Sequence, residues 1–254
     1  MSMRKLSVKK SVNKRPKLRG VILYEGASVL DGAPIVCVAT FETSNRKTGA
    51  MVQTWIIRSD IAPTDAAKTG KDKSVCGSCP HRHYTNGACY VNLGHAPLAV
   101  YKGYKRGIYP TFNESDHADL FTGRKIRLGA YGDPAAVPFE IMANAAQMGL
   151  GHTGYTHQIL HKNFDKRFLR LCQVSADSPK QAARFQAMGA NTFRVAMEGD
   201  GLADNEIECL SDSQGINCID CMLCDGLKKN IALAVHGSRK SNFKTALIPT
   251  TQIA

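Results

Sequence analysis

Two short apolar stretches, residues 34–42 and 50–58, are rich in β-branched residues and flank a polar loop that contains Gly49. This pattern predicts an antiparallel β-hairpin. From about residue 124 the pattern changes, and short apolar stretches alternate with longer segments of helical periodicity. We therefore expect a hairpin followed by a series of βα units.

The first βα unit begins with an apolar stretch at 126–131 that predicts a strand, followed by the turn Gly-Asp-Pro at 132–134. Asp133 is a suitable N-cap, and a proline fits the first turn of a helix. The helical pattern then runs to about Met148, and the next strand is expected to carry Tyr155. The strand, turn and helix signals thus follow in the order of a βα unit.

The second unit repeats this pattern. It predicts a strand at 168–174, a helix that Asp177 or Ser178 caps and that runs to Met188, and a strand at 192–197. A final apolar stretch, IALAVHG, follows. Successive βα units favour a parallel sheet, and their number suits a barrel or a partial barrel.

The predicted fold class is therefore α/β: a partial (βα) barrel of parallel strands with an N-terminal β-hairpin and cysteine-rich metal-binding loops. We expect a basic N-terminal arm at 1–20 and a single domain at 21–254. In such folds the chemistry lies where the strands end. That edge supplies four catalytic candidates, each of which could instead be a helix cap or a hydrogen-bonded core residue: Asp133, His157, Asp177 and His236.

The chain has 254 residues, and its hydrophobic content of 43% supports a sizeable core and excludes a disordered chain. No stretch of about 18 apolar residues occurs, and the N-terminus lacks the apolar segment of a secretory signal. We therefore expect no membrane-spanning segment and a cytoplasmic protein, which would lie in the host cytoplasm if the gene is viral.

The formal net charge is +12, and residues 1–19 hold eight Lys or Arg and no acid. Such an arm is typical of nucleic-acid contact, because Lys and Arg neutralise phosphates whatever the base sequence, and equally of a solvated tail. A second basic stretch, 101–110, interleaves tyrosines with Lys and Arg. It predicts either a surface that stacks bases and binds phosphates or an amphipathic segment with half-buried tyrosines.

The strongest chemical signal is the spacing of the cysteines. Seven of the nine form the patterns C-x2-C-x9-C and C-x8-C-x2-C-x2-C. In a cytosolic protein, where thiols stay reduced, such groups indicate metal ligands rather than disulfides. We call them the first cysteine group (Cys76, Cys79 and Cys89) and the second cysteine group (Cys209, Cys218, Cys221 and Cys224).

Thiolates suit both zinc and iron–sulfur clusters. Structural zinc sites typically draw two thiols from each of two separated knuckles. The run C-x2-C-x2-C at 218–224 instead offers three sulfurs in succession, as in ferredoxins, where each iron takes one thiolate. We therefore favour a [4Fe-4S] cluster on the second cysteine group, with Cys209 as fourth ligand, and keep zinc as the alternative.

The first cysteine group has only three thiols. Either His81, His83 or another residue completes a four-ligand site, or a cluster is held by three thiolates and keeps one iron open for a ligand. A closed site would be structural, whereas an open iron would bind substrate. The two remaining cysteines, Cys37 and Cys172, fall in apolar stretches and are expected to be buried core residues.

Three cysteines ahead of βα units, the turn YGDP at 131–134 and a late cysteine group together resemble the radical S-adenosylmethionine enzymes with an auxiliary iron–sulfur cluster. The CxxC…CY element and the late C-x2-C-x2-C are also similar to small phage-encoded proteins of unassigned function. The resemblance spans roughly residues 76–236. It implies that the first cysteine group holds the catalytic cluster, with Gly132 and Asp133 near the methionine end of S-adenosylmethionine.

The sequence departs from that family in two places. The third cysteine lies ten residues after the second, where the family has C-x3-C-x2-C, and Gly-Asp-Pro stands in place of Gly-Gly-Glu-Pro. Phosphate-loop, dinucleotide-binding, zincin, serine-hydrolase and deaminase motifs do not occur. Three hypotheses remain: a phage-encoded iron–sulfur protein with redox or radical chemistry, a zinc-stabilised nucleic-acid-binding protein, and a metal-stabilised protein with no chemistry of its own.

Overall fold

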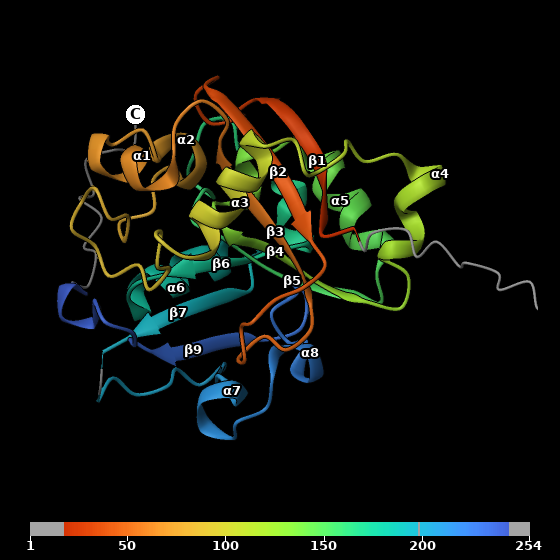
Figure 1. The fold of residues 1–254 in the computed structure, drawn as a ribbon. Helices are drawn as coiled ribbons and strands as arrows, with labels where there is room; N and C mark the ends of the chain where they lie inside the picture. The colour runs from red at the N-terminus through yellow and green to blue at the C-terminus, as the bar shows by residue number, and fades with distance from the viewer. Residues whose placement is uncertain (1–17, 198, 244–254) are drawn as a thin grey trace, which may run out of the picture.

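The computed structural model describes residues 18–197 and 199–243 (Figure 1). Their strands form one nine-stranded sheet in the order β1-β2-β3-β4-β5-β6-β7-β9-β8. Most of the predicted basic arm, residues 1–17, lies outside the described residues.

The N-terminal part of the sheet is antiparallel. β2 (Pro34–Thr40) and β3 (Val52–Arg58) pair with Ile35 opposite Arg58. This confirms the predicted hairpin. The sequence analysis did not anticipate β1 (Gly20–Ala27), which pairs with the other side of β2.

From β3 onward all neighbouring strands are parallel, as the βα pattern predicted. The remaining strands are β4 (Lys125–Tyr131), β5 (Gly151–Thr156), β6 (Gln173–Ala176), β7 (Thr192–Ala196), β8 (Glu206–Glu208) and β9 (Asn230–Ala234).

The α/β class and the parallel strands of the predicted partial barrel are confirmed, but the sheet is open and does not close into a barrel. Closure requires the first and last strands to pair. Here β1 and β8 are the two edges of the sheet, and β8 has only three residues. A count of βα units predicts parallel strands. Whether the sheet closes depends instead on hydrogen bonding between its two outermost strands, and the periodicity of the sequence does not reveal that pairing.

Helices lie against the sheet and at its ends (Figure 1). α5 packs on β1, β4 and β5, α6 packs on β6 and β7, and α1, α2 and α3 pack on β3. The helices are α1 (Pro63–Thr69), α2 (Lys73–Cys76), α3 (Ala96–Lys105), α4 (Glu114–His117), α5 (Phe139–Met148), α6 (Pro179–Ala187), α7 (Leu210–Ser213) and α8 (Cys218–Cys221).

Two predicted elements begin elsewhere than expected. Asp133 caps a short 3-10 turn at Pro134–Ala136, and α5 begins only at Phe139, because a second proline at position 138 resets the start of the helix. The predicted strand at 168–174 is a 3-10 helix at Lys166–Arg170 followed by β6. Asp165 caps that 3-10 helix by accepting a hydrogen bond from the backbone N–H of Arg167.

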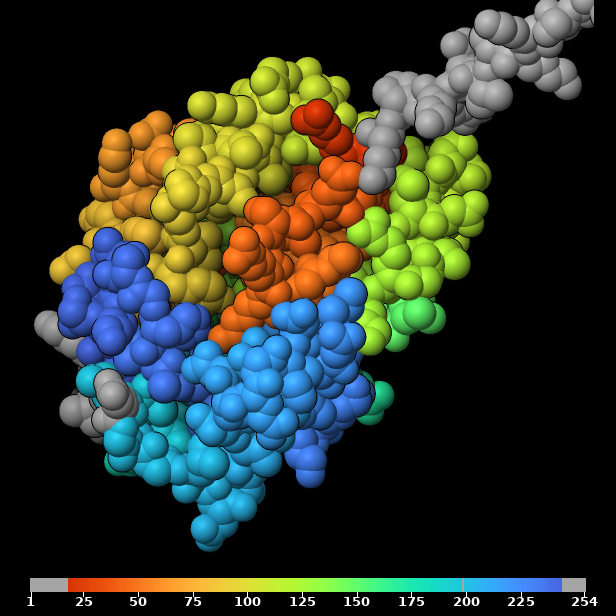
Figure 2. Space-filling model, turned by 60° about the horizontal axis from the view of Figure 1, so that its bottom comes forward, coloured from red at the N-terminus to blue at the C-terminus, as the bar shows by residue number. Residues whose placement is uncertain are grey.

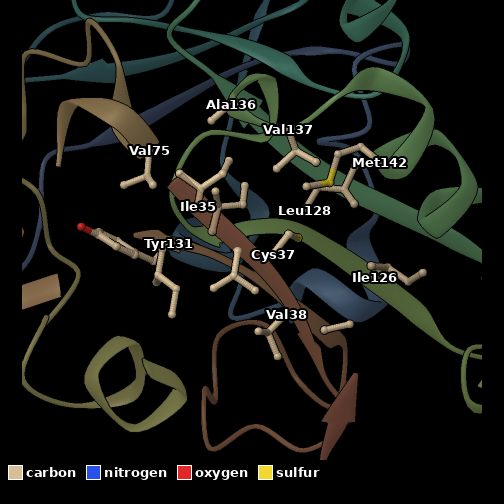
Figure 3. Close-up of a cluster of buried hydrophobic side chains, with 14 of the residues drawn as sticks. Ile35, Cys37, Val38, Val75, Ile126, Leu128, Tyr131, Ala136, Val137 and Met142 are labelled. Carbon is tan, nitrogen blue, oxygen red and sulfur yellow. The ribbon is translucent and has the colours of Figure 1, made fainter. Parts of the chain in front are cut away.

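Side chains of β4 alternate between two different environments. Ile126 and Leu128 point into the main hydrophobic core, where Leu128 lies beside Met142 and Val137 (Figure 3). Cys37 of β2 belongs to the same core and is fully buried. On the opposite face of β4, Arg127 lies outside this core and borders a cavity, whereas Tyr131 contacts both the core and the cavity.

Candidate metal centre

One cavity of about 260 Å³ lies against the face of β4, β5, β6, β7 and β9 that carries Arg127. Most of the strand residues that border it alternate along each strand, as expected when side chains alternate between the two faces of a sheet, and Ala130 is the exception. The strand residues that border the cavity are Arg127, Gly129, Ala130, Tyr131, Thr153, Tyr155, Ser175, Phe193, Val195 and Leu233. The cavity is therefore polar at β4 to β6 and apolar at β7 and β9.

All seven cysteines of the two groups line this cavity, although 148 positions separate the first from the last in the sequence, since 224 − 76 = 148. All nine cysteines of the chain belong to the described residues, and all nine are free thiols. The structure thus brings to one place the two sets of candidate ligands that the spacing had predicted separately.

The first cysteine group comes from the end of α2 and the loop that follows it. Gln158, just past β5, fixes this loop: its Nε2 donates to the Cys76 carbonyl at 3.0 Å, and its Oε1 accepts from the Ser78 N–H at 3.1 Å. Gly77 has φ +54°, and a Cβ there would lie 2.1 Å from Gln158 Oε1. A glycine between the two cysteines is therefore required for this packing. The N–H of Cys89 donates to the His81 carbonyl at 3.0 Å and closes the loop.

The thiols of the first cysteine group lie close enough to influence one another. Burial raises the pKa of Cys76 well above its usual value, and the neighbouring Cys79 and Cys89 raise it further. Burial also raises the pKa of Cys79 and Cys89. Three thiolates could not share this place without a compensating cation, which is the environment in which metal binding replaces the thiol protons.

The second cysteine group lies on the segment of α7 and α8. This segment rests against the β2–β3 loop: the N–H of Cys218 donates to the Lys47 carbonyl at 2.9 Å, and that of Ile219 to the Thr48 carbonyl at 3.1 Å. Figure 2 shows this segment, in light blue, next to the orange residues of the β2–β3 region. At the two ends of the group, Cys209 N–H donates to Ala232 of β9, and the Cys224 carbonyl accepts from Gly154 of β5.

The thiols of this group also lie close enough to influence one another. Burial raises the pKa of Cys224 to about 12, with Tyr155 opposing the shift and the other three cysteines adding to it. Burial also raises the pKa of Cys218, and the nearby Arg127 acts to lower it. Both aromatic and cationic side chains of the sheet therefore reach this group.

No three sulfur atoms of either cysteine group lie in close mutual contact. A tetrahedral zinc site with Zn–S of 2.3 Å places its sulfurs about 3.8 Å apart. Among the described residues, the one set of three or more His, Cys, Asp or Glu ligand atoms that all lie within 4.8 Å of one another contains no cysteine.

Arg127 is buried and lies on the cavity wall. Its Nη2 donates to the Tyr90 hydroxyl at 2.9 Å. Burial acts to lower the pKa of Arg127, but Tyr90, Tyr155 and Cys218 outweigh it, and the pKa is raised. The guanidinium is therefore held on the cavity wall by the Tyr90 hydroxyl.

Of the four strand-end candidates, Asp133 is a structural cap as well as a cavity residue. It is buried, its Oδ1 accepts from the Ala135 N–H at 3.0 Å, and its Oδ2 accepts from the His157 N–H at 2.8 Å and from Gln158 Nε2 at 3.0 Å. Gly132 beside it has φ +82°, and a Cβ there would lie 2.5 Å from the Ile56 carbonyl oxygen.

His157 and Asp177 lie together, and they are joined by His81. His81 Nε2 is 2.6 Å from Asp177 Oδ1, and the His81 ring stacks on Phe243 at 5.2 Å. Burial lowers the pKa of His157, against the opposing effect of Asp177 and Asp133. Burial acts to raise the pKa of Asp177, but the hydrogen bond to His81 and the His157 imidazole outweigh it, and the pKa is lowered.

The other histidines considered from the sequence lie apart from this cluster. His236 lines the cavity but stacks on Tyr90 at 5.2 Å, and its Nδ1 lies 3.2 Å from the Ala234 carbonyl. His83 Nε2 lies 3.0 Å from the Val91 carbonyl oxygen, and burial lowers its pKa. His81 rather than His83 is therefore the histidine of this loop that reaches the cavity.

Cys37 and Cys172 are both buried, as expected, and neither lines the cavity. The tyrosines of the basic stretch at 101–110 pack onto the main core, where Tyr109 is buried and Tyr104 donates to Glu25 Oε1 at 2.5 Å. This is the arrangement of an amphipathic segment rather than of a stacking surface. Within the described residues no helix has the length and apolar character needed to cross a bilayer.

The sequence analysis did not identify four residues that line the cavity together with the thiols: Tyr90, Arg127, Tyr131 and Tyr155. One signal was available for Arg127, because an arginine inside an apolar strand pattern indicates a face that is not packed against a helix. The tyrosines gave no such signal. Comparison with protein-family models, curated proteins and solved structures gave no match, so the function is argued from this site alone.

Proposed function

We propose that the chain is an iron–sulfur protein that holds a [4Fe-4S] cluster on each cysteine group and performs redox or radical chemistry on a ligand in the cavity between them. One observation carries this proposal: seven cysteines from two distant segments line the same cavity. A purely structural metal site would not need its thiols at a cavity shared with a second site.

The chemistry of the donor set supports this proposal. Thiolates are the usual ligands of iron–sulfur clusters, and each iron of a cubane takes one thiolate at a separate corner. The Tyr131 hydroxyl is buried, and burial together with the nearby Cys76 raises its pKa well above the usual value. A hydroxyl that stays protonated at this place suits an anionic, sulfur-rich neighbour, because hydrogen bonds to cluster sulfurs are a usual way to tune such sites.

The two groups would differ in chemistry. The second offers four thiolates, which complete the ligation of a cubane and suit electron transfer. The first offers three, which would leave one iron without a cysteine ligand, and its thiols share the cavity with Gly132 and Asp133. Because the Asp133 carboxylate already accepts three hydrogen bonds, a bound molecule would meet the backbone of this turn rather than a free carboxylate.

The decisive experiment is the content of iron, acid-labile sulfide and zinc per chain in protein purified without oxygen. Cys221→Ala and Cys89→Ala should each lose about half of the iron and sulfide, because each removes one ligand of one cluster. Cys37→Ala is the matched control, since this cysteine is buried away from the cavity, and its iron content should equal that of the wild type.

Zinc without sulfide in the wild type would refute the proposal and favour the zinc-stabilised alternative. Equal iron content in all three variants would show that the ligand grouping is wrong. Titration with S-adenosylmethionine separates the two chemistries: binding that Cys89→Ala abolishes supports radical chemistry, whereas no binding to the iron-loaded protein supports electron transfer.

A further inference from the structure

Three side chains that belong to neither cysteine group meet at the carboxyl ends of the parallel strands. His157 follows β5, Asp177 follows β6, and His81 reaches them from the loop after α2. Their ligand atoms all lie within 4.8 Å of one another, and His81 Nε2 and Asp177 Oδ1 are 2.6 Å apart. The sheet edge therefore gathers two imidazoles and one carboxylate at one point.

Asp177 carries an unsatisfied oxygen at this point. Its side chain is only 1% exposed, its Oδ1 contacts His81, and its Oδ2 is buried with no hydrogen-bond partner among the described residues. Leaving a buried polar atom unpaired costs about 1–3 kcal/mol, and more for a charged group. Native proteins satisfy nearly all such atoms with protein groups, ordered water or ions. The Asp177 oxygen is therefore a vacant acceptor beside two imidazoles.

We propose that His81, His157 and Asp177 bind a single divalent transition-metal ion. Imidazole suits zinc, iron and nickel, and carboxylate suits harder ions such as manganese, so this nitrogen and oxygen set favours Zn²⁺, Fe²⁺ or Mn²⁺. Two His and one carboxylate on three separate elements also match the facial arrangement in which such ions keep open coordination positions.

The site is distinct from the first cysteine group, although the two are neighbours. Cys79 Sγ lies 3.8 Å from His157 Nε2, yet it does not belong to the set of atoms that are all within 4.8 Å of one another. An ion at this place would therefore have nitrogen and oxygen ligands rather than sulfur.

Three protein ligands leave at least one position for water or a ligand oxygen. His81 and His157 line the cavity, so that position faces the space that the cysteine groups also border. The ion would act there as a Lewis acid that binds and polarises an oxygen-containing ligand. The cavity would then combine three metal sites, of which this one uses no cysteine and stands whether or not the clusters form.

The test is a titration of the full-length protein with Co²⁺. Equilibrium binding gives the number of ions bound per chain, and electronic absorption reports their ligands. The wild type should bind one more Co²⁺ per chain than Asp177→Asn, which keeps the shape of the side chain and removes its charge. The absorption lost with that ion should lack sulfur-to-cobalt charge transfer. Asp204→Asn, a change at an exposed aspartate, is the matched control and should bind as the wild type does.

His81→Gln provides a second variant in case Asp177→Asn is unfolded, and circular dichroism checks the fold of both. Removal of either ligand should weaken binding of this ion at least about tenfold. Equal Co²⁺ binding by the wild type and a folded variant overturns the proposal, and so does sulfur-to-cobalt absorption in the difference spectrum. Iron and sulfide measured in the same samples keep this result separate from the cluster proposal, because Asp177→Asn should leave both unchanged.

Discussion

The buried ion pair between Arg194 of β7 and Glu206 of β8 holds the edge of the sheet from which the second cysteine group begins. Both side chains are fully buried. Arg194 Nε lies 2.8 Å from Glu206 Oε1, its Nη2 lies 2.7 Å from Oε2, and the Ala203 N–H also donates to Oε2 at 3.0 Å. Glu206→Gln would leave the guanidinium buried without its counter-ion.

Removal of one partner of a buried pair destabilises a protein by about 3–5 kcal/mol, because the remaining charge is left uncompensated. We expect Glu206→Gln to lose stability in that range, which is a large part of the 5–15 kcal/mol typical of a domain. Glu208→Gln is the matched control, because Glu208 lies on the same three-residue strand and is exposed. It should change stability by about 0.5 kcal/mol or less.

The pH dependence gives an independent check. Burial acts to raise the pKa of Glu206, but the hydrogen bonds from Arg194 and Ala203 outweigh it, and the pKa is lowered. A group with a lowered pKa stabilises the fold above its unfolded value, about 4.3, and loses that contribution as pH falls through the folded value. The difference in the free energy of unfolding between the wild type and Glu206→Gln should therefore be largest at neutral pH and decrease in acid.

The assay is urea unfolding followed by far-UV circular dichroism across this pH range, with hydrogen exchange of β8 and β9 to detect local opening. Cys209 follows β8 directly, and its N–H donates to the Ala232 carbonyl of β9. Loosening of this edge should therefore displace Cys209, so the variant should retain less metal at the second cysteine group than at the first. If Glu206→Gln proves as stable as Glu208→Gln at neutral pH, the ion pair does not hold this edge and the reasoning fails.

Three further predictions follow from single contacts. Gly132→Ala should destabilise the fold by more than Gly123→Ala. Both alanines would be held at a positive φ, which costs about 1–3 kcal/mol, but only at Gly132 does the new Cβ meet a backbone oxygen. Equal urea midpoints of the two variants would contradict this. Iodoacetamide should alkylate the partly exposed cavity thiols of Cys209 and Cys221 in metal-free native protein and spare Cys37, which is fully buried; mass spectrometry reads the labelled sites, and early Cys37 labelling would contradict its burial. Arg127→Met should lower the reduction potential of a cluster on the second cysteine group, because a nearby cation stabilises the added electron. Tyr90→Phe keeps that cation and should change the potential less. Redox titration of the two variants measures both potentials.

The hairpin and the parallel strands were predictable because they depend on local signals. Apolar stretches, turn residues and caps such as Ser178, which accepts from the Gln181 N–H at the start of α6, act within a few positions. The 3-10 helix at Lys166–Arg170 was missed because its apolar residues resemble those of a strand, and the deciding feature is a cap at Asp165. Local chemistry thus predicted the order of elements, but not the pairing of the sheet edges.

The cysteine groups were visible because metal ligands need fixed spacing, whereas their meeting in one cavity depends on tertiary contacts. The contact between Cys218 and Lys47 joins positions 171 residues apart, since 218 − 47 = 171. The meeting of His81 with Asp177 is of the same kind. Both candidates had been identified by residue type, but only the fold shows that they face each other.

The polarity of the strands gives a reason to expect a resident ligand in the cavity. Parallel sheets are normally covered on both faces, and their strands are then apolar on both sides. In β4 to β6 one face instead carries Arg127, Thr153 and Ser175, while the other packs on helices. Covering such a face with an apolar layer would bury a cation and two hydroxyls, which is unfavourable. This face therefore suits polar or inorganic material, and the thiols that surround it are the groups that would hold such material in place.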